Sequence, residues 1–357
     1  MTEKTSLSQN SFFSRFGGLL VIIVLLILLP FVVGLMEGAS PGEVLVNAGG
    51  TSKFVQGLAI EIFILAIYAL SYDLIFGITG MLSFGHSMFF ATGAYLSGIL
   101  LKNFNMSLGL TILWVLVAAV VNALLFGIVL PRVKGITFAL VTLGMGSVFH
   151  IVIMSREVGD YTGADVGLQA VPVPDFINPA TQRLVFYFVA MAVMFVVYLM
   201  YKRFVDSPTG RVCVAIRENE GRAKMLGYNT FVFKLVALIV SSLTAALAGI
   251  LHALYQPIVS PNTAAMGFTV TALLIILIGG VGTLNGALVG AAVYRLLDFG
   301  LRRYLGESAS FINGAIYILI VLYLPFGIVG TWKLKSAQIK QGRQNLMKLL
   351  KLDKKKG

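Results

Sequence analysis

The sequence predicts an all-α protein, a polytopic integral membrane helix bundle with about ten transmembrane helices. The first reason is composition, because 58% of the 357 residues are hydrophobic and only 12% are charged. Soluble domains usually contain about a quarter charged residues. The second reason is a series of apolar runs long enough to cross a bilayer. The third is that basic residues are confined to a few stretches between those runs.

A helix needs roughly 20 apolar residues to cross a hydrocarbon core of about 30 Å. By this rule the predicted spans are 17–37, 54–77, 84–101, 108–130, 135–154, 184–204, 231–255, 262–280, 284–301 and 309–330. The third and ninth spans are short and rich in glycine, so the sequence leaves open whether they cross fully or fold back. The predicted parts are an N-terminal segment (1–16), a transmembrane domain (17–330) with an outer loop (155–183) and a cytoplasmic loop (205–230), and a basic tail (331–357).

Lys and Arg residues predict the orientation, because short cytoplasmic loops contain an excess of both. They concentrate in the stretches 202–234 and 333–357. An even number of predicted spans separates these stretches, so both are predicted to lie in the cytoplasm. Counting the predicted spans back from 202–234 to the start of the chain places the N-terminus in the cytoplasm too. We therefore expect a multi-pass membrane protein, surrounded by lipid. The net charge of +12 then reflects topology, and no nucleic-acid partner is expected.

Several kinds of catalytic motif are missing from the sequence. It contains no G-x-x-x-x-G-K-[ST] phosphate loop and no H-E-x-x-H zinc motif. The histidines His86, His150 and His252 belong to separate spans, so their spacing predicts no metal site. No soluble domain is predicted either. We expect no enzymatic activity and no cofactor in this chain, and any ATP hydrolysis would take place on another subunit. Cys213 is the only cysteine and is interpreted as an ordinary small residue.

The cytoplasmic loop contains a predicted amphipathic helix at 211–226. Its apolar side chains fall on one helical face: Val212, Ala215, Ile216, Ala223 and Leu226. Such a face outside the membrane needs a partner. The sequence leaves two alternatives, namely packing on the protein's own bundle or on lipid, and docking into a groove on a motor subunit.

Three segments resemble the branched-chain amino-acid ABC importer permeases of the LivM type. They are GRVCVAIRENEGRAKMLGYNTFVFKL from Gly210, GMLSFGHSMFFATGAY (80–95) and LIGGVGTLNGALVGA (277–291). The first also resembles the E-A-A-x-x-x-G loop of ABC importers, with Glu220, Ala223 and Gly227 at matching positions. The resemblance covers about residues 65–330.

This resemblance implies a permease of the bacterial plasma (inner) membrane that shares its substrate path with a second permease subunit. It implies ATP on cytoplasmic ATP-binding subunits and delivery of an amino-acid substrate by an extracytoplasmic solute-binding protein. The loop helix would be the coupling helix, and its expected contact residues are Arg217, Glu218, Glu220, Ala223 and Gly227.

Other functions remain open at the level of sequence. One is a urea or amide importer of the same class, although Val281 stands where urea-type relatives have Arg in G-G-R-G-T-L. Another is an ion-coupled secondary transporter, in which Glu61, Asp73 and His150 would carry protons. A third is a non-transporting membrane scaffold.

Polar residues and glycines inside or between the spans are the candidates for the translocation path. They are Asp73, Ser83, Gly85, His86, Gly282 and Asn285, which lie in or beside two similar Gly-rich breaks, Ile78–Tyr95 and Ile278–Tyr294. The alternative is that they form a hydrogen-bond network that holds a break in place.

Three further expectations concern polar residues with structural roles. Glu61 and Asp73 point about 120° apart on one helix, so they are not a carboxylate pair. Asn122 and His150 are predicted to form hydrogen bonds between helices. The side chains of Arg295, Asp298 and Arg302 are predicted to pair along one helix face.

Overall fold

The computed structural model describes residues 9–38, 40–45, 50–133, 135–332 and 335–336. The chain divides into two compact units, Met1–Ile60 with Pro174–Met191 and Glu61–Val173 with Ala192–Gly357. Helices α3 (Thr51–Asp73) and α8 (Arg183–Asp206) each begin in the first unit and continue into the second. Most of the predicted basic tail lies outside the described residues.

The first unit contains α1 (Gln9–Met36), α2 (Pro41–Leu45), a 3₁₀ turn (Asp175–Ile177) and the first parts of α3 and α8. Helix α1 begins at Gln9, earlier than the predicted start at 17, so part of the predicted N-terminal segment is helical.

A proline inside α1 explains one of two hydrogen bonds that its backbone carbonyls accept from neighbouring helices. Pro30 has no backbone N–H, so the carbonyl of Leu26 one turn earlier has no helical donor. The hydroxyl of Tyr187 in α8 donates to that carbonyl at 2.7 Å. The hydroxyl of Ser52 in α3 donates to the carbonyl of Pro30 at 2.8 Å. The carbonyl that the proline leaves without a helical donor is thus satisfied by a neighbouring helix.

Helix α10 (Thr230–Tyr255) is central to the second unit, where it packs against α4 (Ser87–Lys102) and α5 (Leu108–Val129). Small residues allow close approach: Gly93 of α4 lies against the backbone of Ala246, and Gly249 of α10 lies against the carbonyl of Phe90. A side chain at either glycine would collide with the facing helix, as in other closely packed membrane helices.

The predicted hydrogen bonds between helices have mixed outcomes. The side-chain amide of Asn122 in α5 donates to the hydroxyl of Thr92 in α4 at 2.7 Å, which confirms that prediction. His150 lies in α6 (Ile136–Met154), and its Nε2 is buried without a hydrogen-bond partner among the described residues. For this atom of His150 the prediction is wrong.

Helices α11 (Met266–Gly279), α12 (Leu284–Leu305) and α13 (Ala309–Tyr323) complete the second unit. On α12, Asp298 pairs with Arg302 at 2.8 Å and with Arg295 at 3.1 Å, as the spacing predicted. Asn313 of α13 also donates to Asp298 at 3.2 Å, so this carboxylate joins two helices.

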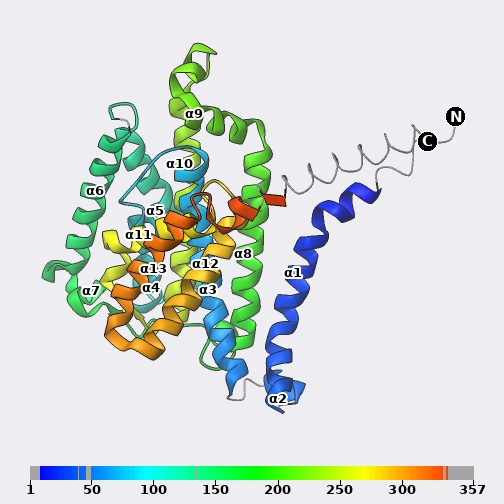
Figure 1. The fold of residues 1–357 in the computed structure, drawn as a ribbon. Helices are drawn as coiled ribbons and strands as arrows, with labels where there is room; N and C mark the ends of the chain where they lie inside the picture. Colours follow the sequence, from blue (N-terminus) through cyan, green and yellow to red (C-terminus); the bar gives the residue numbers. More distant parts are fainter. Residues whose placement is uncertain (1–8, 39, 46–49, 134, 333–334, 337–357) are drawn as a thin grey trace, which may run out of the picture. The chain divides into compact units, whose positions relative to one another are not determined.

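Short elements order much of the predicted outer loop. They are α7 (Gly159–Thr162), two 3₁₀ turns (Arg156–Val158 and Ala164–Val166) and β1 (Leu168–Gln169). Strand β1 pairs antiparallel with β2 (Ile258–Val259), which follows α10. In Figure 1, α7 lies at the opposite end of this unit from α9 (Pro208–Met225).

Seven helices within the described residues are long and apolar enough to cross a membrane. They are Thr51–Ile78, Leu108–Val129, Ile136–Met154, Arg183–Asp206, Thr230–Tyr255, Leu284–Leu305 and Phe311–Trp332. The predicted spans 17–37 and 262–280 correspond to shorter apolar helices, Val21–Met36 and Met266–Gly279. The predicted span 84–101 is α4, whose 16 residues extend roughly 24 Å at 1.5 Å per residue. The expected number of about ten is therefore not confirmed, because three of the predicted spans correspond to shorter helices.

Candidate functional site

Two helix breaks in the second unit form the centre of the site. In the first, α3 passes into a π-helix (η1, Leu74–Ile78) and then an irregular stretch that ends where α4 begins. The second separates α11 from α12, where Gly280 has φ 123° and Gly282 has φ 73°. Residues with a side chain disfavour positive φ, so these glycines permit the turn. The two breaks are the similar Gly-rich segments of the sequence.

Asp73 joins the two breaks. Only 1% of this residue is exposed, and its Oδ1 accepts a hydrogen bond from the backbone N–H of Gly282 at 2.7 Å. A side chain at Gly77 would collide with the Asp73 carboxylate and with the Gly282 backbone. The second oxygen, Oδ2, is buried without a hydrogen-bond partner among the described residues. Two separately predicted path candidates, Asp73 and Gly282, are thus in direct contact.

Arg217 of α9 reaches the same place. Its guanidinium Nη1 donates a hydrogen bond to the carbonyl of Gly77 in the first break. A side chain at Gly282 would meet the same nitrogen at 2.7 Å, and one at Gly80 would meet the Arg217 stem at 3.1–3.2 Å. The absence of side chains at these glycines therefore leaves the room that Arg217 occupies. We call the contact of Asp73, Gly77, Arg217 and Gly282 the junction.

Two other path candidates, His86 and Ser83, lie in the first break and are fully buried. His86 Nε2 lies 2.8 Å from the hydroxyl of Ser71, and its ring packs beside Tyr68 and Tyr72. The hydroxyl of Tyr72 donates to the carbonyl of Ser83 at 3.1 Å. These contacts hold the irregular stretch against α3.

The remaining path candidates lie in separate helix contacts. Gly85 packs against the backbone of Thr142 in α6, where a side chain would not fit. Asn285, in the first turn of α12, accepts a hydrogen bond from the hydroxyl of Tyr198 in α8 at 2.5 Å. Of the six candidates, the structure brings Asp73 and Gly282 together and places the other four in contacts of their own.

Helix α9 packs partly on its own bundle. Val212, Ile216 and Ala223 are buried together, with Phe233 of α10 against them. Cys213 is also buried, and its Sγ lies 3.8 Å from the carbonyl of Phe233. This burial raises the pKa of its thiol.

The predicted apolar face of α9 is wrong at two positions, because Ala215 is exposed and Leu226 is 71% exposed. Asn219 interrupts the helix with φ −161° and ψ 100°, so the residues after it no longer follow the register of those before it. The Asn219 side chain accepts a hydrogen bond from the N–H of Arg222 at 2.9 Å, as an N-cap does. Helix α9 therefore consists of two short helical segments.

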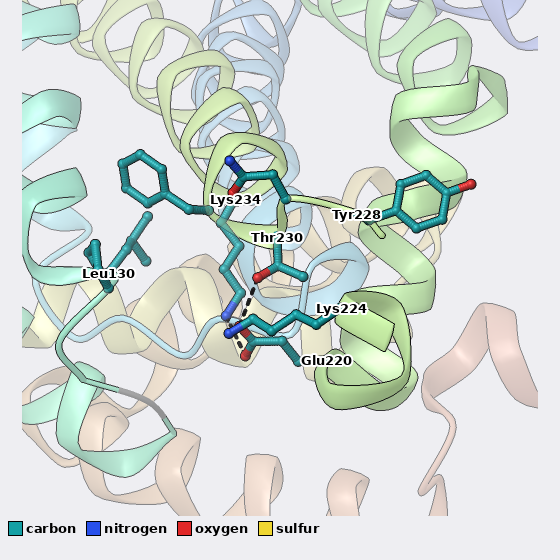
Figure 2. Close-up of a pocket in the computed structure, with 9 residues that line it drawn as sticks. Leu130, Glu220, Lys224, Tyr228, Thr230 and Lys234 are labelled. Carbon is teal, nitrogen blue, oxygen red and sulfur yellow. Dashed lines mark hydrogen bonds and ion pairs between the residues drawn. The ribbon is translucent and has the colours of Figure 1, made fainter. Parts of the chain in front are cut away.

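Glu220, in the second segment, anchors α9 to the start of α10. Its carboxylate accepts hydrogen bonds from Lys234 at 2.8 Å and from Thr230 at 3.1 Å, and it pairs with Lys224 at 3.2 Å. Figure 2 shows these three side chains converging on Glu220, while Tyr228 points away. Burial raises the pKa of Glu220, but the hydrogen bond and charge of Lys234 outweigh it and lower that pKa to about 2. Glu220 is thus ionised at neutral pH.

A cavity of 320 Å³ opens beside this cluster, lined by Glu220, Lys224, Lys234 and residues of the α5–α6 connection such as Pro131. Large apolar side chains are exposed where α9 ends: Met225 by 83%, Leu226 by 71% and Tyr228 by 43%. Gly227 has φ 87° and permits the chain reversal there. We call Met225, Leu226 and Tyr228 the α9 surface. Glu218, another expected contact residue, is also exposed.

Sequence reasoning missed an ion pair between two long helices. Glu61 of α3 pairs with Arg295 of α12, and Gln256 donates to Glu61 at 3.1 Å. The expectation that Glu61 and Asp73 do not pair is confirmed, since each has other partners. A charge inside an apolar helix needs a partner of opposite sign or a polar cavity. The sequence shows Glu61 and Arg295 as charged residues of opposite sign within predicted apolar spans. Pairing these two charges would have predicted their contact.

Comparison with known proteins gives a consistent result. A family model described as "Branched-chain amino acid transport system / permease component" matches residues 54–324. The high-affinity branched-chain amino acid transport system permease protein LivM of Salmonella typhimurium is 25% identical, over 79% of this chain and 72% of its own. The corresponding LivH protein of Escherichia coli is 25% identical, over 74% of this chain and 91% of its own.

Among solved structures, PsaBC from Streptococcus pneumoniae in complex with Fab matches with a TM-score of 0.42 at 15% identity, over 75% of this chain and 91% of that chain. That likeness supports no inference about function. The family model spans most of the chain and confirms the resemblance found in the sequence. This multi-pass membrane protein belongs to the permease components of branched-chain amino acid transport systems.

Proposed function

We propose that this chain is the permease subunit of an ATP-driven importer for branched-chain or other hydrophobic amino acids. It forms the translocation path with a second permease subunit and receives its substrate from an extracytoplasmic solute-binding protein. ATP binds to separate cytoplasmic subunits, and the chain itself is a transport component rather than an enzyme. The names of its LivM and LivH relatives support the substrate class and the role of permease.

The observation that most supports this proposal is the position of α9. On one side, Arg217 enters the junction and binds the backbone of the first break. On the other, Met225 and Leu226 remain exposed. One element thus contacts both helix breaks and presents apolar side chains for a partner. A cytoplasmic ATPase that binds the α9 surface and moves on ATP hydrolysis would displace Arg217 and the two breaks with it.

The proposed orientation places α9 and both chain termini in the cytoplasm. The basic residues on and around α9, including Arg211, Arg222 and Lys224, support it, since such residues are retained on the cytoplasmic side. The end that bears α7 and the β1–β2 pair then faces outward and meets the solute-binding protein.

Within this mechanism, we assign Asp73 and Gly282 to the moving contact between the breaks. Ser83 and His86, fully buried beside α3, hold the first break in shape.

Reconstitution tests the function. Vesicles containing this chain, its second permease and the ATP-binding subunits, supplied with the solute-binding protein, should accumulate leucine only when ATP is present on the ATPase side. Uptake by this chain alone, or uptake driven by a pH gradient without ATP, would contradict the proposal. Accumulation of urea instead of leucine would contradict the substrate class alone.

Substitutions in the α9 surface test the docking step. Met225→Asp with Leu226→Asp should abolish co-purification of the ATP-binding subunits, because two desolvated carboxylates oppose an apolar contact. Val166→Asp is the matched control, since Val166 is 66% exposed in a turn at the opposite end of the unit. Retention of the ATPase by the double variant would place the docking contact elsewhere.

A further inference from the structure

A small cavity between α3, α4, α10, α11 and α12 has an unusual lining for a membrane protein. Its volume is 180 Å³, and charged and amide groups from Glu61, Arg295 and Gln256 form one part of the wall. Pockets for drug-sized ligands measure roughly 300–1,000 Å³, so this cavity suits a ligand of few atoms. It lies beside the last turn of α10, whereas α9 adjoins the first turn.

The two charges are adjacent, hydrogen-bonded and partly accessible. Glu61 pairs with Arg295, and their side chains are 22% and 23% exposed. Each is held by a further contact: Gln256 donates to Glu61 at 3.1 Å, and Arg295 donates to Asp298 at 3.1 Å. A carboxylate and a guanidinium therefore stand side by side, each fixed in position, at the edge of a space with room for a ligand.

Apart from the ring of His252, which packs beside Phe90 with centroids 5.3 Å apart, the rest of the wall is apolar. The rings of Phe90 and Phe268 pack with centroids 4.6 Å apart, and both line the cavity together with Ile64 and Leu65. Aromatic pairs of this kind form a well-defined surface for an apolar group. The lining is therefore divided into a charged part of both signs and a part that is aromatic and aliphatic.

This division matches one class of small molecule. An α-amino acid has an ammonium and a carboxylate on the same carbon atom, so its two charges are as close together as those of Glu61 and Arg295. Arg binds carboxylates through two parallel hydrogen bonds, and a carboxylate accepts from an ammonium. An apolar side chain attached to the same carbon atom of the ligand then requires an apolar surface nearby, which Phe90 and Phe268 supply.

We propose that this cavity is a transient binding site for a zwitterionic amino acid with an apolar side chain. The ligand ammonium binds Glu61, its carboxylate binds Arg295, and its side chain packs against Phe90 and Phe268. This inference rests on the proposed function, since it gives the imported amino acid a station on the side of the unit away from α9.

The resident ion pair explains why such a site would bind weakly. The ligand must separate Glu61 from Arg295 before it contacts either, so two ion pairs replace one and part of the gain is lost. Weak, reversible binding is what a transport path requires, because a tightly held substrate is released slowly. When the ligand leaves, the pair re-forms and neither charge remains unpaired.

Direct binding to the purified complex, without the solute-binding protein, tests the site. Millimolar L-leucine should raise the melting temperature, as a ligand of the folded state does. Isopentylamine and 4-methylpentanoate, which each retain only one of the two charges, should raise it far less. Equal stabilisation by leucine and either analogue would overturn the proposal.

Substitutions separate a binding role from a structural one. Glu61→Gln and Arg295→Gln should each weaken leucine binding by about 10-fold or more, the loss expected for one charge-assisted hydrogen bond. A purely structural pair predicts lower stability with unchanged leucine affinity. If these variants do not fold, Leu65→Trp fills the cavity without changing a charge and should block binding, whereas Ile62→Trp on the same helix is the control.

The two proposals fail separately. If the wild-type complex shows no ATP-driven leucine uptake, the proposed function is wrong. If the wild type transports leucine and Leu65→Trp binds and transports it equally well, only the binding site is wrong.

Discussion

The junction and the cavity lined by Glu61 and Arg295 each contain one carboxylate and one arginine, yet their bonds differ. At the junction, Asp73 accepts from a backbone N–H and Arg217 donates to a backbone carbonyl. In the cavity, Glu61 and Arg295 bind each other. When a side chain that is bonded to the backbone of another segment moves, it displaces that segment. Two side chains that are bonded only to side chains can instead separate and bind a ligand without displacing the backbone. The same residue types therefore support transmission in one place and binding in the other.

The largest expected effect comes from Arg217→Ala at the junction. Removing the guanidinium disconnects α9 from the first break, so leucine uptake should fall by about 10-fold or more, the scale of one strong charge-assisted hydrogen bond. ATP hydrolysis by the assembled complex should continue. The measurement is uptake and phosphate release in the same vesicles.

Two comparisons sharpen that result. Arg217→Lys should restore only part of the uptake, because Lys lacks the planar fork of Arg. Arg222→Ala removes an exposed charge from the same helix and should leave uptake close to normal. Equal loss in Arg217→Ala and Arg222→Ala would show that net charge on α9, not the junction contact, is what matters.

A methyl group added at Gly77 should disrupt the junction sterically. The new Cβ in Gly77→Ala would overlap the Asp73 carboxylate and the Gly282 backbone, and overpacking of this kind costs about 1–3 kcal/mol. Gly144→Ala in α6 is the control, since a Cβ there meets nothing within 4 Å. Thermal unfolding in detergent should show a lower melting temperature for the first variant and an unchanged or higher one for the second.

Replacing each carboxylate by its amide removes the charge but keeps one oxygen acceptor, and this change should affect Asp73 and Glu61 differently. Asp73→Asn still presents an oxygen to the N–H of Gly282, so uptake should fall by less than about 3-fold, the cost of weakening one neutral hydrogen bond. Glu61→Gln cannot bind an ammonium by charge, and its loss should be larger. Abolition of uptake by Asp73→Asn would instead favour proton coupling through Asp73.

The smallest effect concerns Glu220, a carboxylate outside the membrane that is bonded only to side chains, as Glu61 is. Its folded-state pKa of about 2 lies below the ordinary value of 4.5. Its contribution to stability is therefore present above about pH 4.5 and is lost as pH falls from there toward 2. The melting temperature of the wild type should decrease slightly more over this range than that of Glu220→Gln.

The sequence predicted what depends on local pattern. The apolar runs located the long helices, and spacing alone predicted the Asp298 ion pairs on α12. The end of α9 at Met225 lies within one residue of the predicted end, whereas the helix begins at Pro208, three residues before the predicted start at 211. The kink at Asn219 was not predicted, because an asparagine in a helical pattern gives no indication that its backbone becomes extended. After the kink, Ala223 is buried as predicted, but Leu226 is exposed.

Contacts between distant segments could not be predicted in the same way. Asp73 and Gly282 are 209 residues apart in the chain, and no local pattern brings them together. The sequence identified both as candidates because a charge and a Gly-rich break are each uncommon in apolar helices. The partner of each residue depends on how the helices pack, which only the tertiary structure shows. Contact of the six candidates with the substrate path stays a prediction.

The burial of Cys213 between its own helix α9 and α10 has a practical consequence. As the chain's sole thiol, covered by the contact of α9 with α10, it reports on that contact without any engineering. A maleimide reagent should react with it only when α9 lifts away, so the rate of alkylation measures how often this happens. Comparing that rate with and without ATP would follow the motion of α9 in the wild-type importer itself.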